Sequence, residues 1–450
     1  MERKKGREDV RGKGLSRRQF LGRSAAVAAG AVGFPYIVPA SALGLNGTVA
    51  PSNRIVMGCI GVGGQGTYNM TAFLGQPDAQ VVAVCDVDTK HRAGAKEKVE
   101  QTYAAQKADG SYKGCDEYGD FRELLAREDI DAVTICTPDF WHPIVAVAAA
   151  KAGKDMYCEK PLANSIGEGR AVCNAVAQYG RVFQTGSHER SRDNARYACE
   201  LVRNGRIGKL HTIRCNLPID NHAPIGPQPV MPVPEELDYD MWLGPAPCAP
   251  YTEKRCHFYF RYILDYSGGE VTDRGAHIID LGQLGNKTDH TGPISVEGTG
   301  DFPRDGLFNT AMGYHFEFEY ANGVRMICES SGTRGIKFEG TDGWIFIFIH
   351  GGNLSASSPA LLKEIIGPNE EHLGRSPGHH RDFLNNVKLR GTTFAPPEVG
   401  HRTGSMCHLA NIAMKLGRKL RWDPDKEQFI GDEEANRRIM PSLRAPWRVV

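Results

Sequence analysis

The pattern of apolar and polar positions divides the chain into two halves of different character. In the first half, short apolar runs alternate with longer stretches whose apolar residues recur at helical spacing. The runs cover residues 54–60, 80–85, 131–136, 155–158 and 181–184, and the helix-like stretches cover 67–74, 121–127, 144–152 and 166–179. Buried strands that alternate with helices are typical of a parallel sheet covered on both faces. The pattern predicts a doubly wound α/β domain over residues 50–185.

The second half has strand-like segments in which apolar and polar residues alternate more regularly. These segments cover residues 210–217, 310–320, 323–330 and 343–349, and residues 402–418 have helical spacing. Ala321-Asn322-Gly323 joins two of the segments and is a strong hairpin signal. Residues 220–256 and 351–379 are rich in Pro and Gly, which favours loops. We expect an α+β domain over 186–450, with a large mixed, mainly antiparallel open sheet and helices on one face.

The first 42 residues do not fit either domain. Residues 1–13 are mostly charged, Arg17-Arg18 precedes an apolar pair, and residues 24–38 are weakly apolar and rich in Ala and Gly. Ala40-Ser41-Ala42 resembles a cleavage site. The segment predicts a twin-arginine signal peptide over 1–42 and a periplasmic or exported protein. A disordered basic tail with a chance Arg-Arg pair is the alternative.

Composition and charge narrow the classes of partner. The formal net charge is +1 and no basic stripe is present, so we expect no nucleic-acid partner. We also expect no membrane partner once the signal is removed, because no other apolar run approaches 18 residues. The 12 cysteines form no Cys-x-x-Cys pair, and we expect no metal site. Four of them lie in apolar runs and are expected to be small buried residues: Cys59, Cys85, Cys136 and Cys158.

A glycine-rich loop, Gly61-Val62-Gly63-Gly64-Gln65-Gly66, follows the first predicted strand. The next strand ends in Asp86, twenty residues after Gly66. Strand, glycines, helix, strand and acid in this order form the dinucleotide-binding fingerprint. Gly61 permits the tight turn, Gly63 lets the pyrophosphate approach, and Gly66 allows the helix to pack on the strand. The flanking strands and the acid favour this interpretation over an ordinary glycine turn.

Asp86 also bears on the choice of cofactor. Its carboxylate can accept hydrogen bonds from the ribose hydroxyls and repels a 2′-phosphate, which favours NAD over NADP. Lys90 and Arg92 follow closely, so NADP remains possible.

Reactive side chains cluster where predicted strands end. Thr137-Pro138-Asp139-Phe140-Trp141-His142 follows one strand and Glu159-Lys160-Pro161 follows the next. Open α/β sheets bind ligands at the carboxyl ends of their strands. Asp273 and His277 are four residues apart in a predicted helix and can face one ligand. The alternatives are a solvated lysine, a structural histidine and an N-cap aspartate.

Together these motifs resemble the glucose–fructose oxidoreductase, inositol dehydrogenase and rhizopine catabolism (Gfo/Idh/MocA) family. Trp242-Leu243-Gly244-Pro245 and Arg421-Trp422-Asp423-Pro424 extend the resemblance over nearly the whole chain after residue 42. The chain is most similar to the exported branch. Arg274 stands where many relatives have Trp, which leaves the shape and charge of the substrate pocket open.

The resemblance implies that Lys160, Asp273 and His277 act on a sugar or polyol hydroxyl. His277 would be the base, Lys160 would stabilise the developing alkoxide, and Asp273 would orient His277 or bind a neighbouring hydroxyl. The second domain would bind substrate and form a homodimer or homotetramer. The implied cofactor contacts are Gly61, Val62, Gly63, Gly64, Gln65, Gly66, Asp86, Thr137, Pro138, His142, Glu159 and Lys160.

Other residues have two open interpretations. His188, Arg190 and Arg261 are candidate substrate contacts or form surface ion pairs. The aromatic stretch 258–262, together with Trp141 and Trp242, either packs in the core or stacks on sugar rings.

Two functions remain open. The first is an NAD(P)-dependent oxidoreductase that exchanges hydride between a sugar, polyol or glycoside hydroxyl and a tightly held cofactor. The second is a glycosidase or lyase that oxidises a ring hydroxyl only transiently. An exported enzyme with a dissociable cofactor would stop after one turnover, so either the cofactor stays bound and is regenerated by a second substrate, or the net reaction is redox-neutral. A sugar-binding protein without activity is disfavoured because Lys160, Asp273 and His277 are all present.

Overall fold

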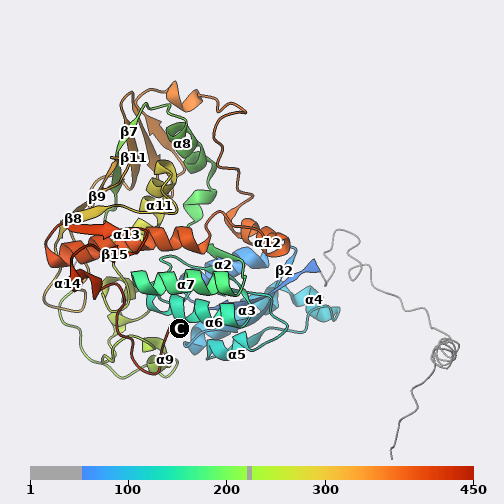
Figure 1. The fold of residues 1–450 in the computed structure, drawn as a ribbon. Coiled ribbons are helices and arrows are strands. Elements are labelled where there is room, and N and C mark those ends of the chain that lie inside the picture. Colours follow the sequence, from blue (N-terminus) through green and yellow to red (C-terminus); the bar gives the residue numbers. More distant parts are fainter. Residues whose placement is uncertain (1–52, 220–224, 450) are drawn as a thin grey trace, which may run out of the picture. The chain divides into compact units, whose positions relative to one another are not determined.

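The first sheet has six parallel strands, five of which are the predicted apolar runs; the polar edge strand β3 (Asp116–Tyr118) is not predicted (Figure 1). The computed structural model describes residues 53–219 and 225–449, so the predicted signal over residues 1–42 lies outside the described residues. In spatial order the strands are β3 (Asp116–Tyr118), β2 (Ala79–Cys85), β1 (Ile55–Ile60), β4 (Ala132–Ile135), β5 (Asp155–Cys158) and β6 (Phe183–Thr185). The order reverses between β1 and β4, and such a reversal leaves a crevice at the carboxyl ends of the strands.

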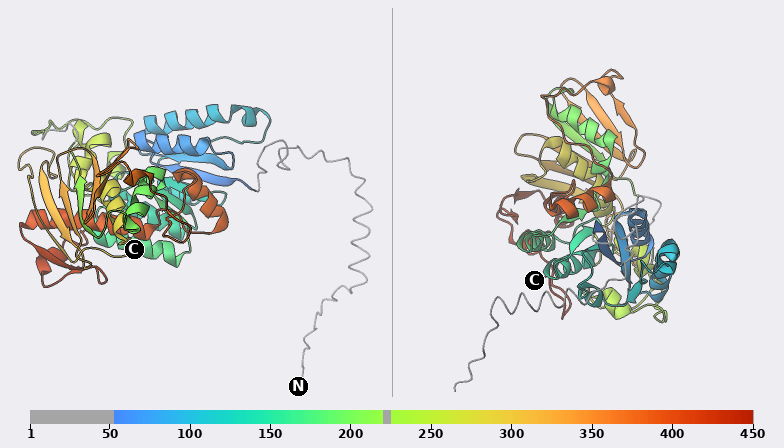
Figure 2. Two further views of the ribbon diagram at one scale, coloured as in Figure 1. Left: turned by 90° about the horizontal axis from the view of Figure 1, so that it is seen from above. Right: turned by 90° about the vertical axis from the view of Figure 1, so that its right-hand side faces the viewer.

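Helices connect these strands and cover the sheet (Figures 1 and 2). They are α2 (Gly64–Leu74), α3 (Thr89–Thr102), α4 (Ala104–Ala108), α5 (Phe121–Leu125), α6 (His142–Lys151) and α7 (Ile166–Gln178). Helix α2 begins three residues before the prediction because the glycine loop forms its first turn. The apolar pattern does not predict α3, since only Ala95 and Val99 of that helix are buried. Asp88 caps α3 by accepting hydrogen bonds from the N–H groups of Lys90 and His91.

The second sheet has nine strands and is mixed but mainly antiparallel, which confirms the predicted fold class. Its parallel pair is β7 with β10. In spatial order the strands are β13 (Leu354–Ala356), β12 (Trp344–Phe348), β11 (Gly335–Gly340), β7 (Leu210–Asn216), β10 (Arg325–Glu329), β9 (Tyr314–Glu319), β8 (Ser295–Gly300), β14 (Leu420–Asp423) and β15 (Gln428–Phe429). The predicted hairpin joins β9 to β10.

Helices pack on one face of this second sheet. Strand β9 shows why, because Tyr314, Phe316 and Phe318 are buried while the intervening residues are polar. Helices α8 (Asp193–Arg203), α11 (Gly275–Asn286) and α13 (Pro397–Leu416) cover the buried face. Helix α13 also packs against α7 and therefore joins the two halves (Figure 1). The other α-helices of the described residues are α9 (Tyr239–Leu243), α10 (Glu270–Asp273), α12 (His379–Leu389) and α14 (Glu433–Asn436).

Three of the four cysteines that are expected to be buried are buried. Cys59, Cys85 and Cys158 are buried, Cys136 is half-buried, and none of these four is in a disulfide. Within residues 53–219 and 225–449, no helix has both the length and the apolar character that a bilayer crossing requires.

Candidate functional site

A cavity of about 640 Å³ lies where the strand order of the first sheet reverses. The loops after β1, β4 and β5 supply one side of its lining. The other side comes from the second half of the chain, through the segment 257–262, the region of α10 and α11, and His350. A volume of this size is ordinary for a small-molecule or cofactor site.

Two glycines at the head of the cavity, Gly61 and Gly66, are required by their surroundings. Gly61 has φ +76°, and a Cβ there would lie 2.6 Å from the backbone carbonyl of Cys136. A Cβ on Gly66 would lie 1.8 Å from the carbonyl oxygen of Gly61, so no larger residue allows α2 to approach β1. Gly64 faces open space, with nothing within 4 Å of a Cβ position. The loop therefore exposes backbone at the start of a helix, where phosphate groups bind.

Asp86 ties this loop to the next turn. Its Oδ2 accepts a hydrogen bond from the Val62 N–H at 2.8 Å, and its Oδ1 accepts one from the Asp88 N–H at 3.0 Å. Val62 is buried and does not line the cavity, so its contribution is this backbone contact. Lys90 pairs with Glu236, and Arg92 donates to the backbone oxygen of Asp86 at 3.1 Å. Lys90 and Arg92, the two side chains that could bind the 2′-phosphate of NADP, thus already interact with other protein groups.

Glu159 connects the glycine loop to Lys160. Its Oε1 accepts hydrogen bonds from Asn69 Nδ2 at 2.8 Å and from Gln65 Nε2 at 3.1 Å. Its Oε2 accepts one from the backbone N–H of Lys160 at 3.2 Å. Both Glu159 and Asn69 are buried. The prediction omits Asn69, although a polar residue on the buried face of a helix is the signal that identifies it.

Lys160 and Asp273 form an ion pair across the cavity. Lys160 Nζ donates to Asp273 Oδ1 at 2.6 Å. Burial opposes ionisation of Asp273, but the charges of Lys160 and Arg261 outweigh it and hold the pKa of Asp273 below its usual range. The contact of Asp273 therefore runs to Lys160 and fixes the direction of the ammonium group.

His277 lies among other imidazoles. It is 4% exposed, and the centroids of the His188 and His350 rings lie 4.7 and 5.4 Å from its own. Burial and the charge of Lys160 lower the pKa of His277 well below 6.5, which keeps the ring neutral at neutral pH. Among the described residues, its Nδ1 has no hydrogen-bond partner. A neutral imidazole beside a lysine is suited to accept a proton.

The helix that carries Asp273 and His277 is not continuous. Helix α10 ends at Asp273 and α11 begins at Gly275, with Arg274 between them. Arg274 also faces the cavity, and its Nε lies 3.1 Å from Glu270 Oε2. Arg274 therefore brings an ion pair into this part of the cavity lining.

Residues after β4 complete the lining. Thr137, Pro138 and His142, which are expected to contact the cofactor, all line the cavity. His142 Nδ1 lies 2.7 Å from the Pro161 carbonyl oxygen and so holds the two strand ends together. Asp139 is buried and accepts a hydrogen bond from Ser267 Oγ at 2.5 Å. Burial, followed by the charge of Asp273, raises the pKa of Asp139 to about 7.

The candidate substrate contacts His188, Arg190 and Arg261 do not all lie at the cavity. His188 and Arg261 line the cavity, but Arg190 is buried elsewhere and its Nε lies 2.6 Å from Asp280 Oδ2. The interpretation of Arg190 as a substrate contact or a surface ion pair is therefore wrong, because it forms a buried ion pair. Trp141 and Trp242 are buried in the core and also border the cavity.

Three histidines of the cavity are absent from the prediction: His91, His257 and His350. Each is a lone histidine in its part of the sequence, and only the fold brings them to one cavity.

Comparisons with known proteins agree with this geometry. The model of an oxidoreductase family with an NAD-binding Rossmann fold matches residues 55–187. The model of the C-terminal alpha/beta domain of the same family matches residues 226–449.

Individual relatives include dehydrogenases and glycosidases. The chain is 24% identical over 391 residues to the myo-inositol 2-dehydrogenase of Thermotoga maritima, which covers 83% of this chain and 99% of that protein. It is 29% identical over 234 residues to an alpha-N-acetylgalactosaminidase of Shewanella oneidensis, which covers 46% of this chain and 49% of that protein. A solved levoglucosan dehydrogenase in complex with NADH and levoglucosan has the same fold, with a TM-score of 0.58 and 18% sequence identity. The match covers 82% of this chain and 99% of that chain.

Proposed function

Since the chain belongs to the Gfo/Idh/MocA oxidoreductase family, we propose that it exchanges hydride between a sugar, polyol or glycoside hydroxyl and NAD. One observation carries this proposal: Lys160, Asp273 and His277 line the same cavity as the glycine loop. The names of relatives that act on inositol and levoglucosan support a polyhydroxylated substrate.

The residues of the cavity fit NAD. The conformation of Gly61, the open space at Gly64 and the carboxylate of Asp86 match the needs of a pyrophosphate and a ribose. When bound, NAD supplies the hydride acceptor.

The chain's own residues supply the proton chemistry. Lys160 donates a hydrogen bond to the substrate oxygen and stabilises its developing negative charge. Asp273 holds the ammonium group of Lys160 in place. His277 removes the hydroxyl proton, because its ring is neutral and one nitrogen has no partner among the described residues.

A second candidate is redox-neutral cleavage of a glycoside through a transient ketone. The matches to an alpha-N-acetylgalactosaminidase and to a glycosyl hydrolase family 109 protein, 37% identical over 123 residues, favour it. The same Lys160, Asp273 and His277 would serve its oxidation step, so the cavity itself does not separate the two functions.

One experiment distinguishes them. The protein is incubated with NAD and a panel of glycosides and polyols in deuterated water, and NADH, free sugar and deuterium are measured. Stoichiometric NADH with a keto product supports the oxidoreductase. Free sugar that carries deuterium, without accumulated NADH, supports the glycosidase. If neither NADH nor free sugar forms with any compound, both functions are contradicted.

We also propose export by the twin-arginine route and assembly into a homodimer or homotetramer. Arg17-Arg18 supports export of an already folded and loaded protein. Replacing both arginines by lysine should leave the protein in the cytoplasm, and periplasmic wild-type protein should carry close to one NAD or NADH per chain. An empty periplasmic protein that needs added NAD would contradict tight retention.

A further inference from the structure

A segment of the second half closes over the turn between β2 and α3. We call residues 236–257 the covering segment. Leu237 forms an isolated antiparallel bridge with Asp88. The Thr89 N–H donates to the Glu236 carbonyl at 2.9 Å, and the Asp238 N–H donates to the Val87 carbonyl at 3.0 Å. The covering segment is thus fastened to the residues that directly follow Asp86.

The covering segment is anchored in the core. Leu237 and Trp242 are buried in the hydrophobic cluster that lies against the first sheet. The indole N–H of Trp141 donates to the Trp242 carbonyl at 2.9 Å. Met241, Trp242 and His257 line the cavity, so the covering segment forms a wall of it.

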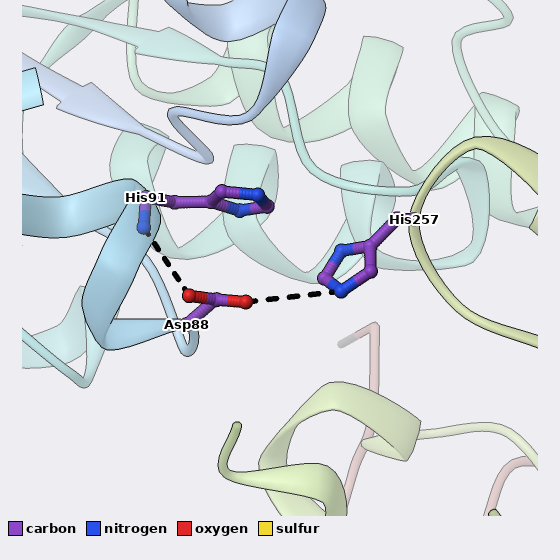
Figure 3. A group of neighbouring side chains, drawn as sticks. All are labelled: Asp88, His91 and His257. Carbon is purple, nitrogen blue, oxygen red and sulfur yellow. Dashed lines mark hydrogen bonds and ion pairs between the residues drawn. The ribbon is translucent and has the colours of Figure 1, made fainter. Parts of the chain in front are cut away.

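Two histidines meet where this wall reaches the Rossmann domain. The rings of His91 and His257 have centroids 5.0 Å apart and cross at 71°. His257 Nε2 lies 3.7 Å from Asp88 Oδ2 (Figure 3). His91 Nδ1 lies 3.7 Å from Asp86 Oδ2. Both histidines line the cavity, and their side chains are 35% and 44% exposed. The pair is therefore accessible from the cavity and does not belong to a packed core.

The backbone at His257 supports a role in binding. Its φ is +53°, in the left-handed region that residues with a Cβ seldom adopt. Such conformations cost free energy and cluster at ligand sites, where the surroundings enforce them. His91 also lies close to the glycine loop, because its ring is 3.6 Å from the Cβ position of Gly63.

The position of Asp86 shows which part of the cofactor this pair faces. The acid at the end of the second strand of a Rossmann fold binds the adenosine ribose. Because His91 adjoins both Asp86 and Gly63, the pair lies at the adenosine end of the cavity. Imidazoles suit an adenosine diphosphate, since they stack on a purine and donate hydrogen bonds to phosphate.

We propose that His91 and His257 clasp the adenosine diphosphate half of NAD and that the covering segment slows its release. This inference rests on the proposed function only in taking NAD as the cofactor. It supplies a structural basis for retention of the cofactor, because the adenosine end cannot leave until contacts from both halves of the chain are lost.

The experiment measures release of NADH from the full-length protein by fluorescence, after mixing with excess NAD. The variants are His91→Ala and His257→Asn. Asparagine tolerates the left-handed conformation, so His257→Asn removes the ring with little backbone strain. The matched control is His211→Ala, because His211 is exposed on β7 and does not line the cavity.

We expect each clasp variant to release NADH about tenfold faster than wild type, and the control to match wild type. ADP-ribose should bind both clasp variants about tenfold more weakly, while binding of nicotinamide mononucleotide should not change. Wild-type release rates in both variants would overturn the clasp. Equal losses for the two fragments would also overturn it, since the effect would then be general.

A metal ion is the competing occupant. The ligand atoms of Asp88, His91 and His257 lie within 4.8 Å of one another. All measurements are therefore repeated with EDTA. If EDTA alone accelerates release in wild type to the rate of the variants, the three residues hold a metal and the proposal is wrong. If wild type fails to bind NADH at all, the assignment of the cofactor fails, whereas unchanged release in the variants contradicts only the clasp.

Discussion

The ammonium nitrogen of Lys160 lies 2.6 Å from Oδ1 of Asp273, although 113 residues separate them in the chain. Lys160 follows a strand of the first sheet, and Asp273 ends a short helix of the second half. Both side chains are 16% exposed, so the pair is shielded from water but open to the cavity. The two halves of the chain must therefore pack together before Asp273 can orient the ammonium group of Lys160.

Replacing Lys160 by Ala should lower turnover at least about 10²-fold, because the alkoxide loses its stabilising charge. Steady-state kinetics on the true substrate measures the effect, and Lys151→Ala on α6 is the control, since Lys151 is exposed. Lys160→Ala leaves the buried Asp273 carboxylate without its partner, which can destabilise the fold. A Lys160→Met, Asp273→Asn double variant leaves no unpaired charge and tests the loss of the lysine in a folded protein. Turnover near that of wild type in a folded variant would show that Lys160 is not catalytic.

His277 should determine the acid limb of the pH–rate profile. Burial and the charge of Lys160 lower its pKa well below 6.5, and a base must be deprotonated to act. The limb of kcat/KM should therefore lie below pH 6.5, and His277→Gln should lose it together with most of the activity. A variant that keeps both the limb and the activity would place the base elsewhere.

The same shift has a consequence for stability. The folded pKa of His277 is lower than the unfolded pKa, so protonation favours the unfolded chain. The contribution of His277 to stability should be constant above about pH 6.5 and should fall as the pH drops below it. Urea unfolding of wild type and His277→Gln between pH 5 and 8 tests this. Equal pH dependence of the two proteins would contradict it.

Asp139 should make the protein less stable as the pH rises, the opposite of the effect of His277. Its pKa rises from 3.8 to about 7 on folding, mainly through burial, so ionisation favours the unfolded chain. Stability should therefore fall as the pH rises from about 4 to about 7 and then level off. Asp139→Asn should remove this fall and gain on the order of 4 kcal/mol in the free energy of unfolding at pH 8. Urea unfolding at pH 5 and 8 measures it, and Asp305→Asn, at an exposed position, should change nothing.

Asp86 should make the protein prefer NAD. Calorimetry on protein stripped of nucleotide should give an NAD dissociation constant at least about tenfold below that for NADP. Asp86→Asn keeps an acceptor for the Val62 N–H but removes the charge, so it should narrow this preference. Tighter binding of NADP by wild type would sink the assignment.

The outer face of the second sheet should mediate self-association. Trp344, Phe346 and Phe348 of β12 are only half-buried and alternate with buried residues. Aromatic side chains left open on a sheet face are typical of an interface between subunits. Light scattering at micromolar concentration should give a dimer or tetramer mass, and Phe346→Asp should reduce it to a smaller species. A monomeric wild type would refute the prediction, and Lys151→Glu is the matched surface control.

The fold could be predicted from the sequence because burial leaves a local pattern. Five strands of the first sheet are mostly buried and form apolar runs, whereas the edge strand β3 is polar and leaves no such pattern. Helix α3 is not predicted because only two of its residues are buried, too few to form an apolar stripe along the helix. Its first turn is set by the Asp88 N-cap.

The site could be predicted only in part, for a related reason. The glycine loop, Asp86, Lys160 and His277 each belong to a motif with fixed spacing. His350 follows β12 and His257 lies in the covering segment, and neither has a local signal. Their approach to His277 and His91 depends on how the second sheet and the covering segment dock, which no short-range spacing records.

Glu159 limits how this enzyme can be redesigned. One buried carboxylate receives hydrogen bonds from Gln65, Asn69 and the backbone of Lys160. Gly186 leaves room for that carboxylate, since a Cβ there would lie 2.7 Å from Oε2. The glycine loop and Lys160 are therefore structurally coupled through Glu159. A redesigned enzyme has to keep both of them together with this carboxylate. Substrate range can change instead at Arg274 on the opposite wall, whereas its neighbour Asp273 has to stay because it holds Lys160.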